Sequence, residues 1–270
     1  MNKSVSIIGC GWLGFPLAKA LVKNGFKVKG TTTSKDKIDL LNNEQIEAFY
    51  VSVSTESVMG DIKESLTKSD VLVLNIPPGL RENPQSDYFG LIKNLIPYIE
   101  ASQIKKVLFI SSTSVYRDEE TFPEITEDKN PNPDSESGKQ LLKTEALLQN
   151  NPHFKTTVLR FAGLFGDGRH PAKQLSGKTE LSNAEAPVNL IHLEDCVHII
   201  QKIIEHDVFG ETFNASTEPH PSKQSYYTKV CKWINLPLPN YNLTKISKGK
   251  IIQSNKLKKL LNYQFQIKLQ

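Results

Sequence analysis

The stretch Val5–Ser6–Ile7–Ile8–Gly9–Cys10–Gly11–Trp12–Leu13–Gly14 joins an apolar strand to a helix through three spaced glycines. Gly9 permits a tight turn, Gly11 lets the backbone approach a pyrophosphate without a Cβ in the way, and Gly14 lets the helix pack closely on the sheet. Free N–H groups at the helix start face the anion. This placement favours a ligand site over a merely glycine-rich turn. It predicts a dinucleotide site built from Gly9, Gly11, Trp12, Leu13 and Gly14.

The end of the second predicted strand, residues 26–30, bears on the choice between NAD and NADP. A carboxylate there would bind the ribose 2′-hydroxyl and repel a 2′-phosphate. The chain instead continues with hydroxyl groups and a cation, which suit a phosphate, at Thr31, Thr32, Thr33, Ser34 and Lys35. Asp36 lies beyond this run and is expected to start the next helix. We therefore expect NADP as the preferred cofactor, with NAD as the alternative.

Short apolar runs alternate with helix-period segments over the first two thirds of the chain. Strands are expected over 5–8, 26–30, 46–53, 71–76, 107–110 and 157–161, and helices over 14–24, 88–102 and 137–150. Pro97 predicts a kink in the 88–102 helix. Apolar strands separated by helices predict an α/β Rossmann fold, whose doubly wound, mainly parallel sheet is covered on both faces. Residues 1–165 are expected to form this NAD(P)-binding domain.

The later third is less regular. Strands are expected over 188–191 and 211–214, and helices over 194–205, 222–234 and 254–261. No clean linker divides the chain. Residues 166–270 are therefore expected to form mainly a smaller substrate-binding lobe, interleaved with the sheet, to which 186–215 return.

Composition excludes several classes of protein. The chain has 270 residues, of which 38% are hydrophobic and 23% charged, as in ordinary globular proteins. No apolar run approaches the roughly 20 residues that cross a bilayer. Nine residues precede Cys10, too few for a separate apolar targeting segment of about 7 to 15 residues. Three cysteines form neither a disulfide framework nor a metal-ligand pattern. We expect a cytoplasmic protein without a membrane segment or metal site.

Charge is unevenly distributed. The formal net charge is +4, yet ten lysines and no acidic residue follow Glu218. This tail is either a solvated basic surface or a part of the lobe that meets an anionic ligand. No basic motif interleaved with aromatic residues points to nucleic acid, so a small-molecule substrate with an anionic group is expected. The oligomeric state is left open, a homodimer included.

Three further segments carry a family resemblance: Phe109–Tyr116 (FISSTSVY), Leu159–Gly168 (LRFAGLFGDG) and Asn189–Asp195 (NLIHLED). Together with the glycine turn they resemble the short-chain dehydrogenase/reductase superfamily. The likeness is greatest to its extended NAD-dependent epimerase/dehydratase members and to an atypical, YeeZ-like branch. It extends over residues 5 to about 215 and implies a nucleotide-binding oxidoreductase.

The resemblance implies roles for several residues. Ser112 would orient the substrate carbonyl, with Thr113 beside the substrate, and Lys139 would bind the nicotinamide ribose. Ile76, Pro77 and Ser111 are expected on the cofactor side. Relatives carry a catalytic tyrosine four residues before the lysine, but Ser135 stands there, and no tyrosine occurs between Tyr116 and Tyr226. A phenol titrates near ~10, whereas a serine hydroxyl is a far weaker acid, so the usual proton donor is missing.

Other residues are candidates for the proton transfer. Tyr116 is mainly structural in relatives, Tyr88 could lie over the nicotinamide, and His170 could transfer protons near neutral pH. An anionic substrate could contact the basic side chains Arg169, Lys173 and Lys178. His192 is expected to be structural. Two hypotheses follow: an NADP-dependent oxidoreductase, epimerase or dehydratase acting on a nucleotide-sugar-like carbonyl or alcohol, or a non-enzymatic NADP(H)-binding redox sensor or scaffold.

Overall fold

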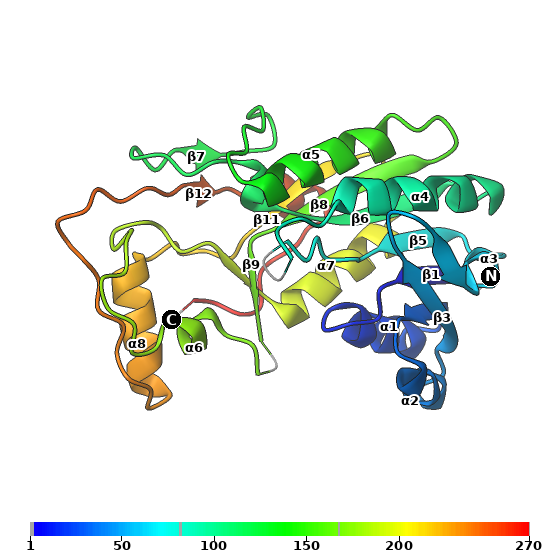
Figure 1. Ribbon diagram of the computed structural model, residues 1–270, viewed down its shortest axis with the longest axis horizontal. Coiled ribbons are helices and arrows are strands. Elements are labelled where there is room, and N and C mark those ends of the chain that lie inside the picture. The colour runs from blue at the N-terminus through cyan, green and yellow to red at the C-terminus, as the bar shows by residue number, and fades with distance from the viewer. Residues whose placement is uncertain (1–2, 81–82, 167, 270) are drawn as a thin grey trace.

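The computed structural model describes residues 3–80, 83–166 and 168–269, and is built around an eight-stranded sheet (Figure 1). Every neighbouring pair of strands is parallel except β3 and β4. The doubly wound, mainly parallel sheet predicted from the sequence is thereby confirmed. Its spatial order is β11 (Thr212–Ala215), β8 (Lys155–Phe161), β6 (Lys106–Ser112), β5 (Val71–Leu74), β1 (Ser4–Ile8), β2 (Lys27–Thr32), β3 (Glu47–Val53) and β4 (Val58–Gly60).

Helices cover both faces of the sheet (Figure 1). On one face, α1 (Gly14–Lys23) and α7 (Leu193–Glu205) share a hydrophobic cluster with β1. The other face carries α3 (Ile62–Leu66), α4 (Tyr88–Ala101) and α5 (Glu136–Gln149). The central strands are buried on both sides, which explains why they are continuous apolar runs rather than alternating ones. Pro97 lies inside α4, which continues beyond it to Ala101.

The later third of the chain leaves the sheet and returns to it. A separate hydrophobic cluster lies beside α6 (Pro171–Leu175) and α8 (Lys223–Trp233), at one end of the molecule (Figure 1). The predicted strand at 188–191 is β10 (Leu190–His192), which pairs with β9 (Gly163–Phe165) rather than joining the main sheet. Within 186–215, α7 packs on the main sheet and β11 pairs with β8.

Several short elements were not predicted from the sequence. They are α3, β4, β9, α6, the 3-10 helix η2 (Thr113–Val115), and the parallel pair β7 (Glu124–Ile125) and β12 (Ile251–Ile252). The helix expected to begin at Asp36 is the 3-10 helix η1 (Lys35–Lys37), followed by α2 (Ile38–Asn43). The last helix, α9 (Asn255–Leu260), was predicted. In the part of the chain that the structure describes, no helix is both long and apolar enough to cross a bilayer.

Candidate functional site

The site lies where the chain order of the sheet reverses. β1 pairs with β2 on one side and with β5 on the other. In doubly wound sheets, ligands bind outside the carboxyl ends of the strands at such a switch point. The glycine turn follows β1 directly, and the segment that begins at Ser112 follows β6, the strand next to β5. The fold therefore places both predicted motifs at the same edge.

The three glycines meet different surroundings. Gly9 has φ +103°, and a Cβ on it would lie 2.5 Å from the Asn75 carbonyl oxygen. A Cβ on Gly14 would lie 2.1 Å from the Gly9 carbonyl oxygen. These two positions therefore require glycine for folding. Gly11 is exposed, and a Cβ there would meet no atom within 4 Å. Nothing in the folded chain requires glycine at position 11, so the open space suits a ligand that approaches the backbone.

Two side chains brace this turn from neighbouring strands. Asn75, at the end of β5, donates from Nδ2 to the Gly9 carbonyl oxygen at 2.9 Å. The Thr31 Oγ1 accepts a hydrogen bond from the Gly9 N–H at 3.1 Å. Thr31 is buried, and its hydroxyl serves the turn. This corrects the prediction that Thr31 contacts a 2′-phosphate, because only part of the 31–35 run faces outward.

The rest of that run is arranged around a local turn. Thr32 is also buried, and its Oγ1 accepts from the Ser34 N–H at 3.1 Å, so it too is removed from the predicted phosphate contacts. Thr33 and Lys35 are exposed and Ser34 is half-buried. The Lys35 Nζ lies 5.5 Å from the centre of the Tyr50 ring. Asp36 falls in η1, as expected for a residue that begins the next helix.

Trp12 connects the glycine turn to the second lobe. The Arg169 guanidinium carbon lies 5.0 Å from the centre of the Trp12 ring, within the range of a cation–π contact. Arg169 forms an isolated antiparallel bridge with Gly166. Asp167, in the same motif, lies outside the described residues. Arg169 was predicted to contact the substrate. The structure places its charge against Trp12 of the glycine turn. The next residue, Leu13, precedes α1 and is buried.

The end of β5 corrects another prediction. Ile76 is half-buried and Pro77 exposed at this edge. Tyr88, however, is buried at 1% exposure, and its hydroxyl donates to the Ile76 carbonyl oxygen at 2.9 Å. Burial raises the pKa of Tyr88 far above its ordinary value. Tyr88 therefore supports the loop from within, and is neither a substrate contact nor a proton donor.

Side chains at the end of β6 alternate between a buried and an accessible face. Ser111 is buried, and its hydroxyl donates to Glu145 Oε1 at 2.6 Å; this corrects its assignment to the cofactor. Thr113 is buried at 7% exposure, which removes it from the expected substrate contacts. Ser112 is half-exposed between them, and its Oγ accepts from the Ser114 N–H at 3.1 Å. Ser112 alone of the three presents its side chain at the edge.

A buried ion pair lies under this segment. Arg160 on β8 binds Glu145 on α5, with Nη2–Oε2 at 2.6 Å and Nε–Oε1 at 3.0 Å, and both side chains are at most 7% exposed. Arg160 Nη1 also donates to the Tyr116 hydroxyl. Burial raises the pKa of Tyr116, although the Arg160 charge opposes this effect. Tyr116 is therefore structural, and the pair ties α5 to β6 and β8.

The start of α5 shows what replaces the tyrosine. The Ser135 hydroxyl accepts from the Gly138 N–H at 3.2 Å and caps the helix. Lys139 is exposed one turn later, and its ammonium has no hydrogen bond or ion pair within residues 3–80, 83–166 and 168–269. Position 135 thus carries a helix cap instead of an acid–base group, while Lys139 is free to bind a ligand.

His170 is engaged at both ring nitrogens. Its Nδ1 accepts from the Ala172 N–H at 3.1 Å, which caps α6, and its Nε2 lies 3.2 Å from the Tyr226 hydroxyl. Burial, and then the nearby Lys173 charge, lower its pKa. The neutral ring is therefore a cap in the second lobe. Lys178 is exposed in the same lobe. His192 also caps a helix, by accepting from the Glu194 N–H at 3.3 Å, as a structural residue would.

A family model described as NAD(P)H-binding matches residues 9–205. The chain belongs to the NAD(P)H-binding family. The matched range begins at the first glycine of the turn and ends at the last residue of α7. Gly9 and Gly14 shape the backbone, and the open position at Gly11 leaves room for a pyrophosphate. The residues present therefore fit the cofactor of this NAD(P)H-binding family, and they would hold it at the helix start.

Several known proteins are similar to this chain over nearly its whole length. Protein YeeZ of Escherichia coli is 33% identical over 267 residues, which cover 98% of this chain and 96% of YeeZ. The UDP-N-acetylglucosamine 4-epimerase of Bacillus cereus is 18% identical, with TM-score 0.78 over 99% of this chain and 96% of its own. A short-chain dehydrogenase/reductase superfamily protein from Agrobacterium tumefaciens with bound NAD is 16% identical, with TM-score 0.76 over 98% and 93%. This member of the NAD(P)H-binding family is thus a relative of Protein YeeZ, and it shares its fold with the two solved structures.

Sequence reasoning missed three residues that shape the site. Asn75 braces the glycine turn, and Glu145 and Arg160 hold the Ser112 segment from below. A signal was present for Arg160, because a charged residue inside a buried strand needs a partner. Nothing in the sequence named that partner. In this NAD(P)H-binding protein, the accessible polar groups at the edge include those of Ser112, Lys139 and the glycine turn.

Proposed function

We propose that this protein is an NADP(H)-dependent enzyme that exchanges hydride with a carbonyl or alcohol carbon of an anionic, nucleotide-sugar-like substrate. The observation that carries the proposal is that Ser112 and Lys139 have accessible polar groups at the same sheet edge as the glycine turn. When bound, the nicotinamide supplies hydride chemistry at its C4. Ser112 then orients the substrate carbonyl by a hydrogen bond, and Lys139 binds the ribose. We place the protein in the cytoplasm, since its three cysteines are unpaired.

A second function is favoured by one observation. With Ser135 used as a helix cap and Tyr88 and Tyr116 buried, none of these three candidate positions offers a free phenol at the edge. A redox sensor or scaffold would need the dinucleotide site and no proton donor. Turnover separates the two functions. NADPH binding without conversion of any compound in a broad nucleotide-sugar panel favours the sensor. The panel is followed by nicotinamide absorbance and by product analysis, since an epimerase gives no net redox change.

Replacing Ser112 with alanine is expected to lower kcat by about 10²- to 10³-fold on any substrate the panel reveals, as for loss of one donor to a developing oxyanion. NADPH affinity should stay unchanged, because Ser112 is assigned to the substrate. Ser114→Ala removes a hydroxyl from the same segment and serves as control. Turnover that survives in Ser112→Ala at the wild-type rate would refute the role given to this hydroxyl.

The cofactor preference also gives an expected result. NADPH should bind at least about ten-fold more tightly than NADH, a difference of about 1.4 kcal/mol. Lys35→Ala should reduce NADPH affinity and leave NADH affinity unchanged, because only the former has a 2′-phosphate. Lys37→Ala, an exposed lysine in the same short helix, is the matched control. Equal affinities for both nucleotides in the wild-type protein would contradict the preference.

A further inference from the structure

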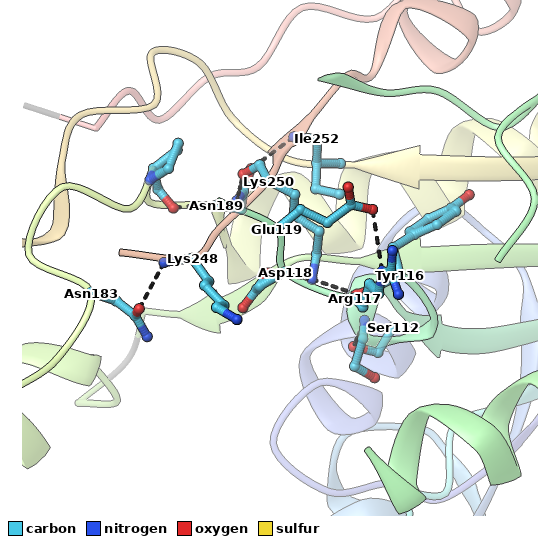
Figure 2. A network of polar contacts seen from close by, with 12 residues as sticks. Ser112, Tyr116, Arg117, Asp118, Glu119, Asn183, Asn189, Lys248, Lys250 and Ile252 are labelled. Atoms are coloured by element: carbon cyan, nitrogen blue, oxygen red, sulfur yellow. Dashed lines mark hydrogen bonds and ion pairs between the residues drawn. The ribbon is translucent and has the colours of Figure 1, made fainter. Parts of the chain in front are cut away.

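The Lys250 side chain contacts Tyr116 and Asp118, shortly after Ser112 in the sequence (Figure 2). Its Nζ donates to the Tyr116 carbonyl oxygen at 2.6 Å and lies 2.9 Å from Asp118 Oδ1, with the side chain only 12% exposed. A single 3-10 turn, η2, separates Ser112 from Tyr116. The Lys250 ammonium is therefore fixed on the segment that presents Ser112.

The backbone of Lys250 is held equally firmly. Asn189 donates from Nδ2 to the Lys250 carbonyl oxygen at 2.8 Å, and its Oδ1 accepts from the Ile252 N–H at 2.9 Å (Figure 2). Gly249 bridges to Glu119, and a Cβ on Gly249 would lie 2.9 Å from Pro187. Three segments that are distant in sequence, 116–119, 187–189 and 249–252, thus contact one another. Lys250 therefore has little freedom to move.

Lys223 lies at the same junction but has no partner for its charge. It is the first residue of α8, and its N–H donates to the Ala186 carbonyl oxygen at 2.9 Å, next to Pro187. Its ammonium makes no hydrogen bond or ion pair with any residue that the structure describes. Burial lowers the pKa of Lys223; the Asp118 carboxylate opposes this and the Lys250 ammonium adds to it. The segment 186–189 binds the backbones of both lysines, Lys223 through the Ala186 carbonyl oxygen and Lys250 through the Asn189 side chain, so the two lie at one junction.

No described carboxylate lies within ion-pair distance of the Lys223 ammonium, whereas Lys250 has one. Asp118 is the acid that acts on both lysines, and its single carboxylate already pairs with Lys250. A half-buried cation without a counter-ion is unfavourable in the free protein. An oxyanion from a ligand would supply the missing charge through charge-assisted hydrogen bonds. Such an arrangement is what a preformed anion subsite requires.

We propose that Lys223 and Lys250 form a subsite for an oxyanion of the substrate, a phosphate or carboxylate group, beside Ser112. The subsite rests on the proposed function for the nature of its ligand. The bound oxyanion and a hydrogen bond from Ser112 would together hold the reacting carbon in one orientation. Such fixed orientation accounts for much of the rate advantage of bound substrates. The subsite also gives a use to two of the ten lysines that follow Glu218.

The test uses protein saturated with NADPH, so that added anions cannot occupy the cofactor site. Isothermal titration with inorganic pyrophosphate, and separately with glucuronate, measures binding of each oxyanion. At least one should bind, and Lys223→Met should weaken it by about ten-fold or more. Lys229→Met removes an exposed charge from the same helix and should leave Kd within about two-fold of wild type. Which anion binds identifies the substrate group.

A second measurement needs no variant. The bound anion should slow acylation of Lys223, followed by mass spectrometry, and leave Lys229 unaffected. Binding of neither anion, or equal binding by wild type and Lys223→Met, would overturn the subsite. The proposed function fails differently, because anion binding at Lys223 without turnover of any substrate would overturn the enzyme and leave the subsite in place.

Discussion

Replacing Glu145 with alanine is expected to lower the free energy of unfolding by about 3–5 kcal/mol. The change leaves the Arg160 guanidinium buried at 7% exposure without its carboxylate, and it removes the acceptor of the Ser111 hydroxyl. Breaking one side of a buried ion pair is costly because the remaining charge is neither hydrated nor neutralised. Urea unfolding, followed by circular dichroism, measures the loss.

Two controls separate this effect from a general weakening of α5. Lys143→Ala, at an exposed position of the same helix, should change stability by no more than about 0.5 kcal/mol. The double variant Glu145→Met with Arg160→Leu removes both charges, and should be more stable than Glu145→Ala alone. A loss below about 1 kcal/mol in Glu145→Ala would show that the ion pair does not hold this region together.

Replacing Gly11 with alanine is expected to weaken NADP(H) binding by about 100-fold, about 2.8 kcal/mol, without harming the fold. The added methyl group meets no protein atom within 4 Å, so the melting temperature should be unchanged or slightly raised. The same methyl group would occupy the space that the pyrophosphate needs. Gly14→Ala is the contrasting variant, because its Cβ would lie 2.1 Å from the Gly9 carbonyl oxygen and should destabilise the protein itself. Titration of both variants with NADPH measures the effect on binding, and thermal unfolding measures the effect on stability.

The sheet and the glycine turn could be predicted because their signals are local. A buried parallel strand is recognised from its own apolar residues, and the tasks of Gly9 and Gly14 follow from a turn of a few residues. The pairs β7–β12 and β9–β10 could not be predicted. Each strand has only two or three residues, and its partner lies far away in the sequence.

The direction of individual side chains was the main source of error at the site. Neighbouring residues of a strand point to opposite faces, so a motif identifies the place and not the exposed group. Ser111 and Ser112 are adjacent, yet one is buried against Glu145 and the other lies at the edge. Thr31 was misplaced for a related reason, since its acceptor role toward Gly9 depends on the pairing of β1 with β2.

The residues that complete the site are far apart in the sequence. Asn75 is 66 residues from Gly9, and Lys250 is 134 residues from Tyr116. No periodicity or spacing connects positions at such distances, and only the folded chain brings them together. Glu145, the partner of Arg160, was likewise not predictable, because it lies on α5 whereas Arg160 lies on β8.

Energy transfer from Trp12 to bound NADPH tests the central claim most directly. The chain has two tryptophans, Trp12 in the glycine turn and Trp233, which is 83% exposed at the end of α8. In a Trp233→Phe variant, all tryptophan emission therefore comes from the turn. Titration with NADPH should quench this emission and produce sensitised nicotinamide fluorescence with saturation. Unchanged Trp12 emission at NADPH concentrations that saturate binding would place the dinucleotide elsewhere, and absence of any binding would contradict the dinucleotide site itself.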